Sequence, residues 1–107
     1  METLETALQV IRDVLDRRLI RLQRVFLFGS RARGEGDRES DWDFYVLVDG
    51  DPDFAQRHAA VTEIKRELAQ LHIPNDVILK SARQFERVKE YPGNLAYEVA
   101  REGMPVS

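Results

Sequence analysis

The chain has 107 residues and a formal net charge of −3, from 16 basic and 19 acidic side chains. This length suits one compact domain, residues 1–107, and the acidic balance excludes the strongly basic surface expected of a protein that binds duplex DNA directly. The absence of cysteine excludes disulfides, thiolate metal sites and thiol nucleophiles. The longest apolar run, Phe44–Val48, has five residues, whereas a membrane span needs about 20, and the first residues show no secretory signal. We therefore expect a cytoplasmic protein without a membrane segment.

The first half of the chain predicts a helix followed by two strands. Residues 4–22 repeat apolar side chains at the i, i+3, i+4, i+7 spacing of an amphipathic helix. Residues 24–28 form a short run of β-branched and aromatic side chains that stops at Gly29, which is typical of a buried strand. Residues 30–40 are polar and predict a loop, and residues 41–48 alternate with the period of two of a second strand.

The second predicted strand places two carboxylates together. Because side chains alternate across a strand, Asp41 and Asp43 share one face. Trp42 then points to the opposite face, where we expect it to join the core.

A second helix is expected after the turn that follows this strand. Asp51 is its predicted N-cap and Pro52 its first helical residue, and Pro74 lies beyond its end. The apolar side chains expected to face the core from this helix are Phe54, Val61, Ile64, Leu68 and Leu71.

The rest of the chain predicts one more strand and two helices. Residues 75–80 alternate as a short strand, and a capping box that begins at Ser81 starts a helix that continues to about Tyr91. After a proline, residues 94–102 resume helical spacing before a C-cap at Gly103, beyond which we expect the chain to fray. The predicted order α-β-β-α-β-α-α indicates an α/β (α+β) fold.

One spacing carries most of the chemical information: Gly29-Ser30, ten residues, then Asp41-x-Asp43. Two carboxylates at positions i and i+2 of a strand stand about 7 Å apart. That geometry suits a pair of divalent cations such as Mg²⁺, which share their oxygen ligands with substrate phosphates. A third carboxylate usually completes such a site, and Asp76, at the start of the third predicted strand, is the candidate.

The residues after the first predicted strand suit a phosphate group. Gly29 lets the backbone approach closely, and the Ser30 hydroxyl and free N–H groups at the start of a helical turn can cradle the phosphate. Arg31 and Arg33 add mobile positive charge, which stabilises the charge that develops on a departing pyrophosphate. A strand-end glycine, a capping serine and a solvated Asp-x-Asp pair are each common alone, so the fixed spacing of all four is what favours a site. The chain contains neither the P-loop motif nor G-x-G-x-x-G.

With its following Asp76-Val77 strand, the pattern Gly29-Ser30-x10-Asp41-x-Asp43 resembles the minimal nucleotidyltransferases of the DNA polymerase beta superfamily, and the likeness covers nearly the whole chain. The resemblance implies a small mixed three-stranded sheet flanked by helices. It also implies transfer of a nucleoside monophosphate, usually AMP, from a Mg-nucleotide such as ATP to a hydroxyl group.

The resemblance also implies roles for individual residues. Gly29 and Ser30, with Arg33 beside them, would bind the triphosphate. Two Mg²⁺ ions, for which Mn²⁺ can substitute, would be held by the residues that also act in catalysis, Asp41, Asp43 and Asp76. Of these, Asp76 would hold the catalytic metal and take the proton of the acceptor.

The acceptor is expected to lie on another molecule. Larger relatives carry an added substrate-binding domain, for which 107 residues leave no room. Small members often resemble the antitoxin half of two-gene HEPN/MNT modules, which implies a helical HEPN-type toxin as both partner and AMP acceptor. Two alternatives stay open: an adenylyltransferase that acts on a small molecule, and a non-catalytic antitoxin or binding module that acts by contact. The base preference and the oligomeric state are not predicted.

Overall fold

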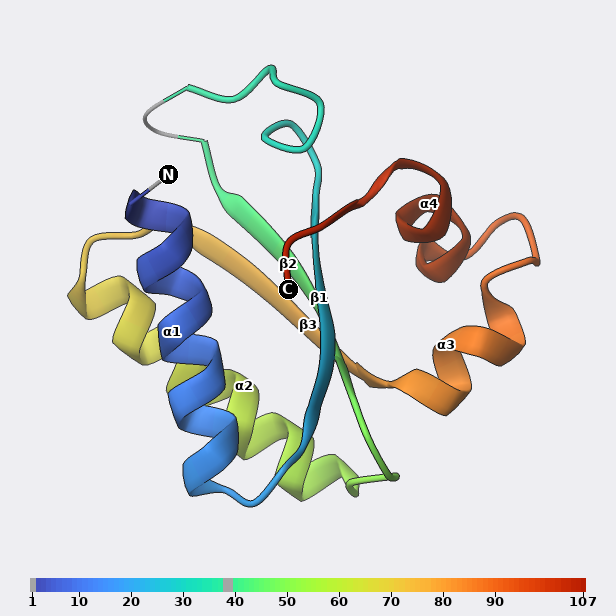
Figure 1. The fold of residues 1–107 in the computed structure, drawn as a ribbon, viewed down its shortest axis with the longest axis horizontal. Helices are drawn as coiled ribbons and strands as arrows, with labels where there is room; N and C mark the ends of the chain where they lie inside the picture. The colour runs from blue at the N-terminus through green and yellow to red at the C-terminus, as the bar shows by residue number, and fades with distance from the viewer. Residues whose placement is uncertain (1, 38–39) are drawn as a thin grey trace.

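The structure is a mixed β-sheet with two helices on each face (Figure 1). The computed structural model describes residues 2–37 and 40–107. Its elements in chain order are α1 (Glu2–Arg17), β1 (Leu22–Phe28), β2 (Trp42–Val48), α2 (Phe54–Gln70), β3 (Asn75–Ser81), α3 (Ala82–Val88), α4 (Leu95–Glu102) and β4 (Met104–Pro105). α1 and α2 cover one face of the sheet, and α3 and α4 lie over the other (Figure 1). Within the described residues, no helix is both long enough and apolar enough to cross a membrane.

The strands are ordered β3-β2-β1-β4, with β1 antiparallel to β2 and β4, and β2 parallel to β3. The predicted α/β class and the order of the first seven elements are confirmed, but the expected three-stranded sheet gains a fourth short strand. The residues after Gly103, expected to fray, pair with β1 instead: Met104 lies opposite Leu27, and the N–H of Val106 donates to the carbonyl of Val25 at 2.9 Å. These bonds satisfy backbone groups that β1 would otherwise expose at a sheet edge.

Two helix ends differ from the sequence prediction. α1 stops at Arg17, earlier than predicted, and Leu19 then takes a left-handed φ of 57° as the chain turns toward β1. α2 is capped by Asp53, not by Asp51. The Asp53 carboxylate accepts a hydrogen bond from the N–H of Gln56 at 2.8 Å, and the Gln56 side-chain oxygen accepts one from the N–H of Asp53 at 2.9 Å. This reciprocal capping box offsets two backbone donors that the helix itself leaves unpaired.

The last two helices begin and end close to their predicted positions. The Ser81 hydroxyl accepts a hydrogen bond from the N–H of Gln84 at 3.0 Å and so caps α3, which ends at Val88. Asn94 caps α4 in the same way through the N–H of Tyr97.

The main core lies between the sheet and the pair α1 and α2. Ala60, Ile64 and Leu68 of α2 are completely buried, as the spacing of a core-facing helix stripe requires. Phe54 and Leu71, which were predicted to face the core, are instead 73% and 49% exposed. Phe54 is the first residue of α2, and Leu71 follows the last helical residue. Both predictions extended the buried stripe past the turns that touch the sheet.

Candidate active site

Three strands meet at the end of the sheet where the predicted carboxylates lie. In the sheet register, Asp43 of β2 lies opposite Phe28, the last residue of β1, and beside Asp76 of β3. Since side chains alternate along a strand, Asp43 lies on the same face as Tyr45, which packs under α3 and α4. Asp41 directly precedes β2 and is exposed. The structure thus brings Asp76 together with the Asp-x-Asp pair.

Gly29 packs directly against the carboxylate of Asp43. Its φ is 76°, in the left-handed region that favours glycine. A Cβ atom at this position would lie 2.2 Å from Oδ2 of Asp43, where the two atoms would overlap. Both the backbone conformation and the available space therefore require glycine here. The contact between Gly29 and Asp43 thus explains why the motif begins with glycine.

The Asp43 carboxylate is partly withdrawn from solvent and lies among like charges. Burial raises the pKa of Asp43 above its ordinary value of 3.8, and the negative charges of Asp76 and Asp41 raise it further. A cation bound at this place would oppose both effects, because it would replace lost hydration and offset the repulsion.

Arg31 holds the loop before Asp41 and does not act as a mobile charge, which corrects the sequence prediction. Its guanidinium donates to the backbone carbonyl of Asp37 at 2.6 Å and to that of Ser40 at 2.8 and 3.0 Å. It also lies over the ring of Trp42, 4.1 Å from the ring centre. Trp42 itself packs against the main core, on the side opposite Asp43, as predicted.

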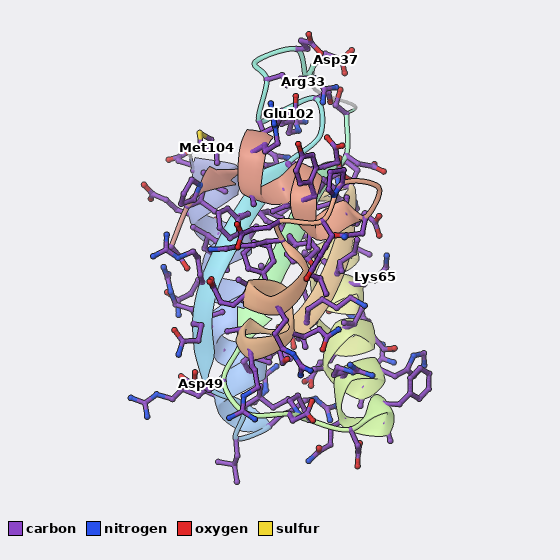
Figure 2. The ribbon with its side chains drawn as sticks, turned by 90° about the vertical axis from the view of Figure 1, so that its right-hand side faces the viewer. Arg33, Asp37, Asp49, Lys65, Glu102 and Met104 are labelled. Atoms are coloured by element: carbon purple, nitrogen blue, oxygen red, sulfur yellow. The ribbon has the colours of Figure 1, made fainter. Side chains whose placement is uncertain are left out.

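Arg33 is the exposed cation of the turn that follows Gly29. The carbonyl of Ser30 accepts hydrogen bonds from the N–H groups of Arg33 and Glu35 at 3.2 and 2.9 Å, which closes the turn. The Arg33 side chain is 51% exposed and donates to the Glu35 carboxylate at 2.9 Å. Figure 2 shows Arg33 close to Glu102 of α4, and these two residues and Gly29 line a small cavity of about 130 Å³.

This arrangement, a glycine-bounded turn beside clustered carboxylates at the end of a small mixed sheet, agrees with comparisons to known proteins. The sequence model of the family described as polymerase beta, nucleotidyltransferase, matches residues 9–106 of this chain. The chain belongs to this nucleotidyltransferase family. The family resemblance predicted from the sequence is therefore confirmed.

One relative and two solved structures add detail to the family membership. MJ0141 of Methanocaldococcus jannaschii, whose assignment as a protein adenylyltransferase is itself inferred, is 36% identical over 61 residues. The match covers 57% of this chain and 62% of that relative, so the chain spans less than two thirds of its length.

The two structures show the nucleotidyltransferase fold. A structure described as a toxin-antitoxin with AMP-PNP has a TM-score of 0.55 at 22% identity. The match covers 91% of this chain and 69% of the chain in that structure. A mutant of the toxin-antitoxin MntA-HpeT has a TM-score of 0.54 at 21% identity. The match covers 89% of this chain and 68% of the chain in that structure. At such low identity the likeness supports the fold alone.

The donor set of this nucleotidyltransferase suits magnesium, although its side chains are not gathered around one point. Asp41, Asp43 and Asp76 offer only carboxylate oxygens, the hard ligands that Mg²⁺ prefers. Among residues 2–37 and 40–107, no three His, Cys, Asp or Glu side chains are placed to hold one metal ion. Asp76 is instead paired with Lys65 of α2, whose Nζ lies 3.3 Å from Asp76 Oδ1. Both side chains are about half exposed (43% and 54%), so releasing this pair to engage an ion costs little.

Lys65 contacts a residue of the candidate site, and sequence reasoning missed it. It lies within α2, 11 residues before Asp76, and no motif marks it. Its contact depends on how α2 packs along β3, which helical periodicity alone does not specify. Sequence reasoning also assigned Glu102 no place beside Arg33, since α4 reaches Arg33 only through the tertiary fold.

Proposed function

We propose that this domain transfers an AMP group from Mg-ATP to a hydroxyl group on a partner protein. The observation that carries the proposal is the set of three carboxylates where β2 and β3 begin, with Gly29 packed against Asp43. Repulsion between clustered carboxylates destabilises the metal-free protein. Bound cations and a nucleotide would give a reason for keeping these carboxylates together.

In this proposal one side of the site binds the triphosphate and the other side binds the metal ions. Gly29, Ser30 and Arg33 bind the triphosphate from the β1 side, through backbone N–H groups, the hydroxyl and the guanidinium. The residues that would hold two Mg²⁺ ions, or Mn²⁺ in their place, are Asp41, Asp43 and Asp76. Bound ions would offset the negative charge of the phosphates and of the departing pyrophosphate.

The transfer is a displacement at the α-phosphorus. The acceptor hydroxyl oxygen forms a new bond to this phosphorus, and the bond to the bridging oxygen of the β-phosphate breaks. Pyrophosphate leaves with that bonding pair. The hydroxyl proton passes to the Asp76 carboxylate, which is more than half exposed and therefore reachable by an acceptor from outside.

The partner we propose is a helical HEPN-type toxin, with this chain as its antitoxin. The toxin-antitoxin nature of the neighbouring structures and the protein adenylyltransferase assignment of MJ0141 support this choice. They favour a protein acceptor over a small molecule.

The test is label transfer from ATP to the partner that co-purifies from the native host. ATP labelled at the α-phosphorus should label the partner, ATP labelled at the γ-phosphorus should not, and EDTA should stop the reaction. Asp43→Asn should abolish labelling while the chain stays folded, whereas Asp51→Asn, a change at an exposed aspartate near the opposite end of β2, should leave it unchanged.

Other outcomes would assign a different function. Labelling of metabolites but not of the partner would show that the acceptor is a small molecule. A partner that is inhibited equally by wild type and Asp43→Asn, with no label transferred, would show an antitoxin that acts by contact.

A further inference from the structure

β3 is an edge strand, because the described strands are ordered β3-β2-β1-β4. The N–H of Trp42 donates to the carbonyl of Pro74 at 2.9 Å, and Trp42 is the parallel partner of Asn75. In a parallel pair, each strand bonds to its neighbour through alternate residues. The even-numbered residues of β3 therefore direct their backbone N–H and C=O groups toward β2. The odd-numbered residues direct theirs to the outer side, where no described strand pairs with them.

The outer side of β3 keeps some access to solvent along the strand. Val77 and Leu79 point into the main core, yet they are 5% and 6% exposed, whereas Val46 of the neighbouring strand is 0% exposed. Figure 2 shows Lys65 at this edge of the molecule and Met104 of β4 at the opposite edge. The backbone groups of an edge strand can pair with those of another chain.

The sequence of β3 is complementary to itself in an antiparallel pairing. Ile78 is its central residue, and Asp76 and Lys80 stand two positions to either side on the same face. If two copies pair about a two-fold axis at Ile78, Asp76 of each copy lies opposite Lys80 of the other. Opposite charges in such cross-strand pairs are stabilising. Val77 then lies opposite Leu79 of the other copy, and both direct their backbone groups outward, as a hydrogen-bonded pair requires.

The axis at Ile78 is also the register that uses the whole strand, Asn75–Ser81. An axis at Asp76 would place two aspartates opposite each other, and an axis at Lys80 would place two lysines opposite each other. Like charges in these positions are destabilising. Every shift of the axis also leaves part of each strand without a partner. Strand length and charge therefore favour the same register.

α2 carries an exposed stripe on the same side of the molecule. Phe54, His58, Val61 and Lys65 recur at the i, i+4, i+7, i+11 spacing of one helix face. Lys65 marks the direction of this face, because its Nζ lies 3.3 Å from Asp76 Oδ1 on β3. Phe54 is 73% exposed and stacks on His58 with 5.7 Å between the ring centres. In the pairing about Ile78, the two α2 helices lie on one face of a continuous sheet, so this stripe faces the second copy.

We propose that two copies of this chain pair through β3 and join their four-stranded sheets into one. A second copy fits this edge because it supplies the matching charges in the matching order. Oδ1 of Asp76 pairs with Lys65, and a carboxylate offers a second oxygen to Lys80 of the other copy. The dimer thus brings a cation of one copy to the border of the candidate site of the other. It does not depend on the proposed transfer reaction.

A single introduced cysteine tests the register, because the chain has no cysteine of its own. The two Ile78 residues would face each other at the axis with about 4.5 Å between their Cα atoms, within the range that a disulfide spans. Ile78→Cys should therefore form a covalent dimer under mild oxidation, which a reducing agent separates. Thr6→Cys, at an exposed position of α1, is the matched control and should not do so.

The charges give a second test, measured by sedimentation. Lys80→Glu and Asp76→Lys each place like charges opposite each other in both pairs, so each variant alone should dimerise about tenfold more weakly than wild type, or less. An equal mixture of the two variants restores both ion pairs and should dimerise like wild type. Arg12→Glu, the same change of charge at an exposed position of α1, should have no effect.

Three results would overturn the proposal. Wild type might sediment as a monomer up to millimolar concentration, or the mixture of variants might stay monomeric. A folded Ile78→Cys that forms no more disulfide than Thr6→Cys would place the interface elsewhere. Crosslinking of Cys-bearing Ile78→Cys to a co-purified protein instead of to a second copy would assign the edge to that protein. If circular dichroism shows that Ile78→Cys does not fold, the mixture of charge variants decides.

Discussion

The two faces of the sheet differ in how completely they are packed. On the α1 and α2 face, the completely buried side chains are apolar, and the large ones include Ile11, Leu15, Phe44, Ile64 and Leu68. The ion pair between Arg17 of α1 and Glu63 of α2, at 2.9 Å, also joins the two helices. On the α3 and α4 face, the buried cluster is smaller, and it includes a tyrosine hydroxyl next to a cavity of about 320 Å³. The same face carries Asp43, whose ionised form is destabilised by burial and by neighbouring charge.

This difference indicates that one face supplies most of the stability, while the other carries the candidate site. On a fully apolar face, every side chain that is buried stabilises the folded state. The other face gives up part of that gain, because it leaves a cavity and holds like charges together. Substitutions on the two faces should therefore separate stability from activity.

The largest expected effect on stability comes from the α1 and α2 face. Ile64→Ala removes a completely buried side chain and should lower the free energy of unfolding by about 2–5 kcal/mol. Urea denaturation measures this loss. Thr62→Ala, at an exposed position of the same helix, should stay within about 0.5 kcal/mol of wild type. If Ile64→Ala also changed the labelling rate per folded molecule, the two faces would not be functionally separate.

The next largest effect should fall on activity. Gly29→Ala places a Cβ atom 2.2 Å from Asp43 Oδ2, so the carboxylate must move, and a displacement of this size can cost on the order of 100-fold in rate. Gly34→Ala is a matched control, because Gly34 has a similar φ of 75° but no atom within 4 Å of the added Cβ. Both variants carry the backbone strain, and only Gly29→Ala should lose label transfer. Equal losses would show that strain, not the contact with Asp43, explains the glycine.

Sequence reasoning predicted the packed face better than the site face. Ile64 and Leu68 were found from helical spacing, because a helix that packs on a sheet must repeat its apolar residues. The family was found from Gly29 and the Asp-x-Asp pair, whose spacing reflects a contact between neighbouring strands. The β4 pairing could not be found this way, since Met104 and Pro105 have no strand-like pattern of their own. The Lys65 contact with Asp76 depends on the three-dimensional packing of α2 on β3.

A smaller effect should appear at the start of α2, the end of the packed face where the sequence prediction was wrong. Asp53→Ala removes the carboxylate that accepts from the N–H of Gln56 and should cost about 1 kcal/mol of stability. Asp51→Ala, at the position predicted to be the cap, should cost less than about 0.5 kcal/mol. Thermal unfolding of the two variants under one set of conditions measures the difference. The reverse order would restore Asp51 as the cap.

The smallest effect, and the most telling, is a gain in stability at the site. Because burial, Asp76 and Asp41 raise the pKa of Asp43 above 3.8, the folded protein holds the Asp43 proton more tightly than the unfolded chain does. The resulting stability is fully present below pH 3.8 and is lost as the pH rises through the higher folded pKa. In EDTA, Asp43→Asn should therefore unfold at a higher urea concentration than wild type at neutral pH, and this advantage should shrink as the pH falls toward 4. Adding Mg²⁺ should stabilise wild type more than the variant, because an ion that binds only the folded state shifts the equilibrium toward it. A variant less stable than wild type at neutral pH would mean that Asp43 makes a net favourable contribution to the metal-free fold, and the contrast between the two faces would then fail at the residue on which it depends most.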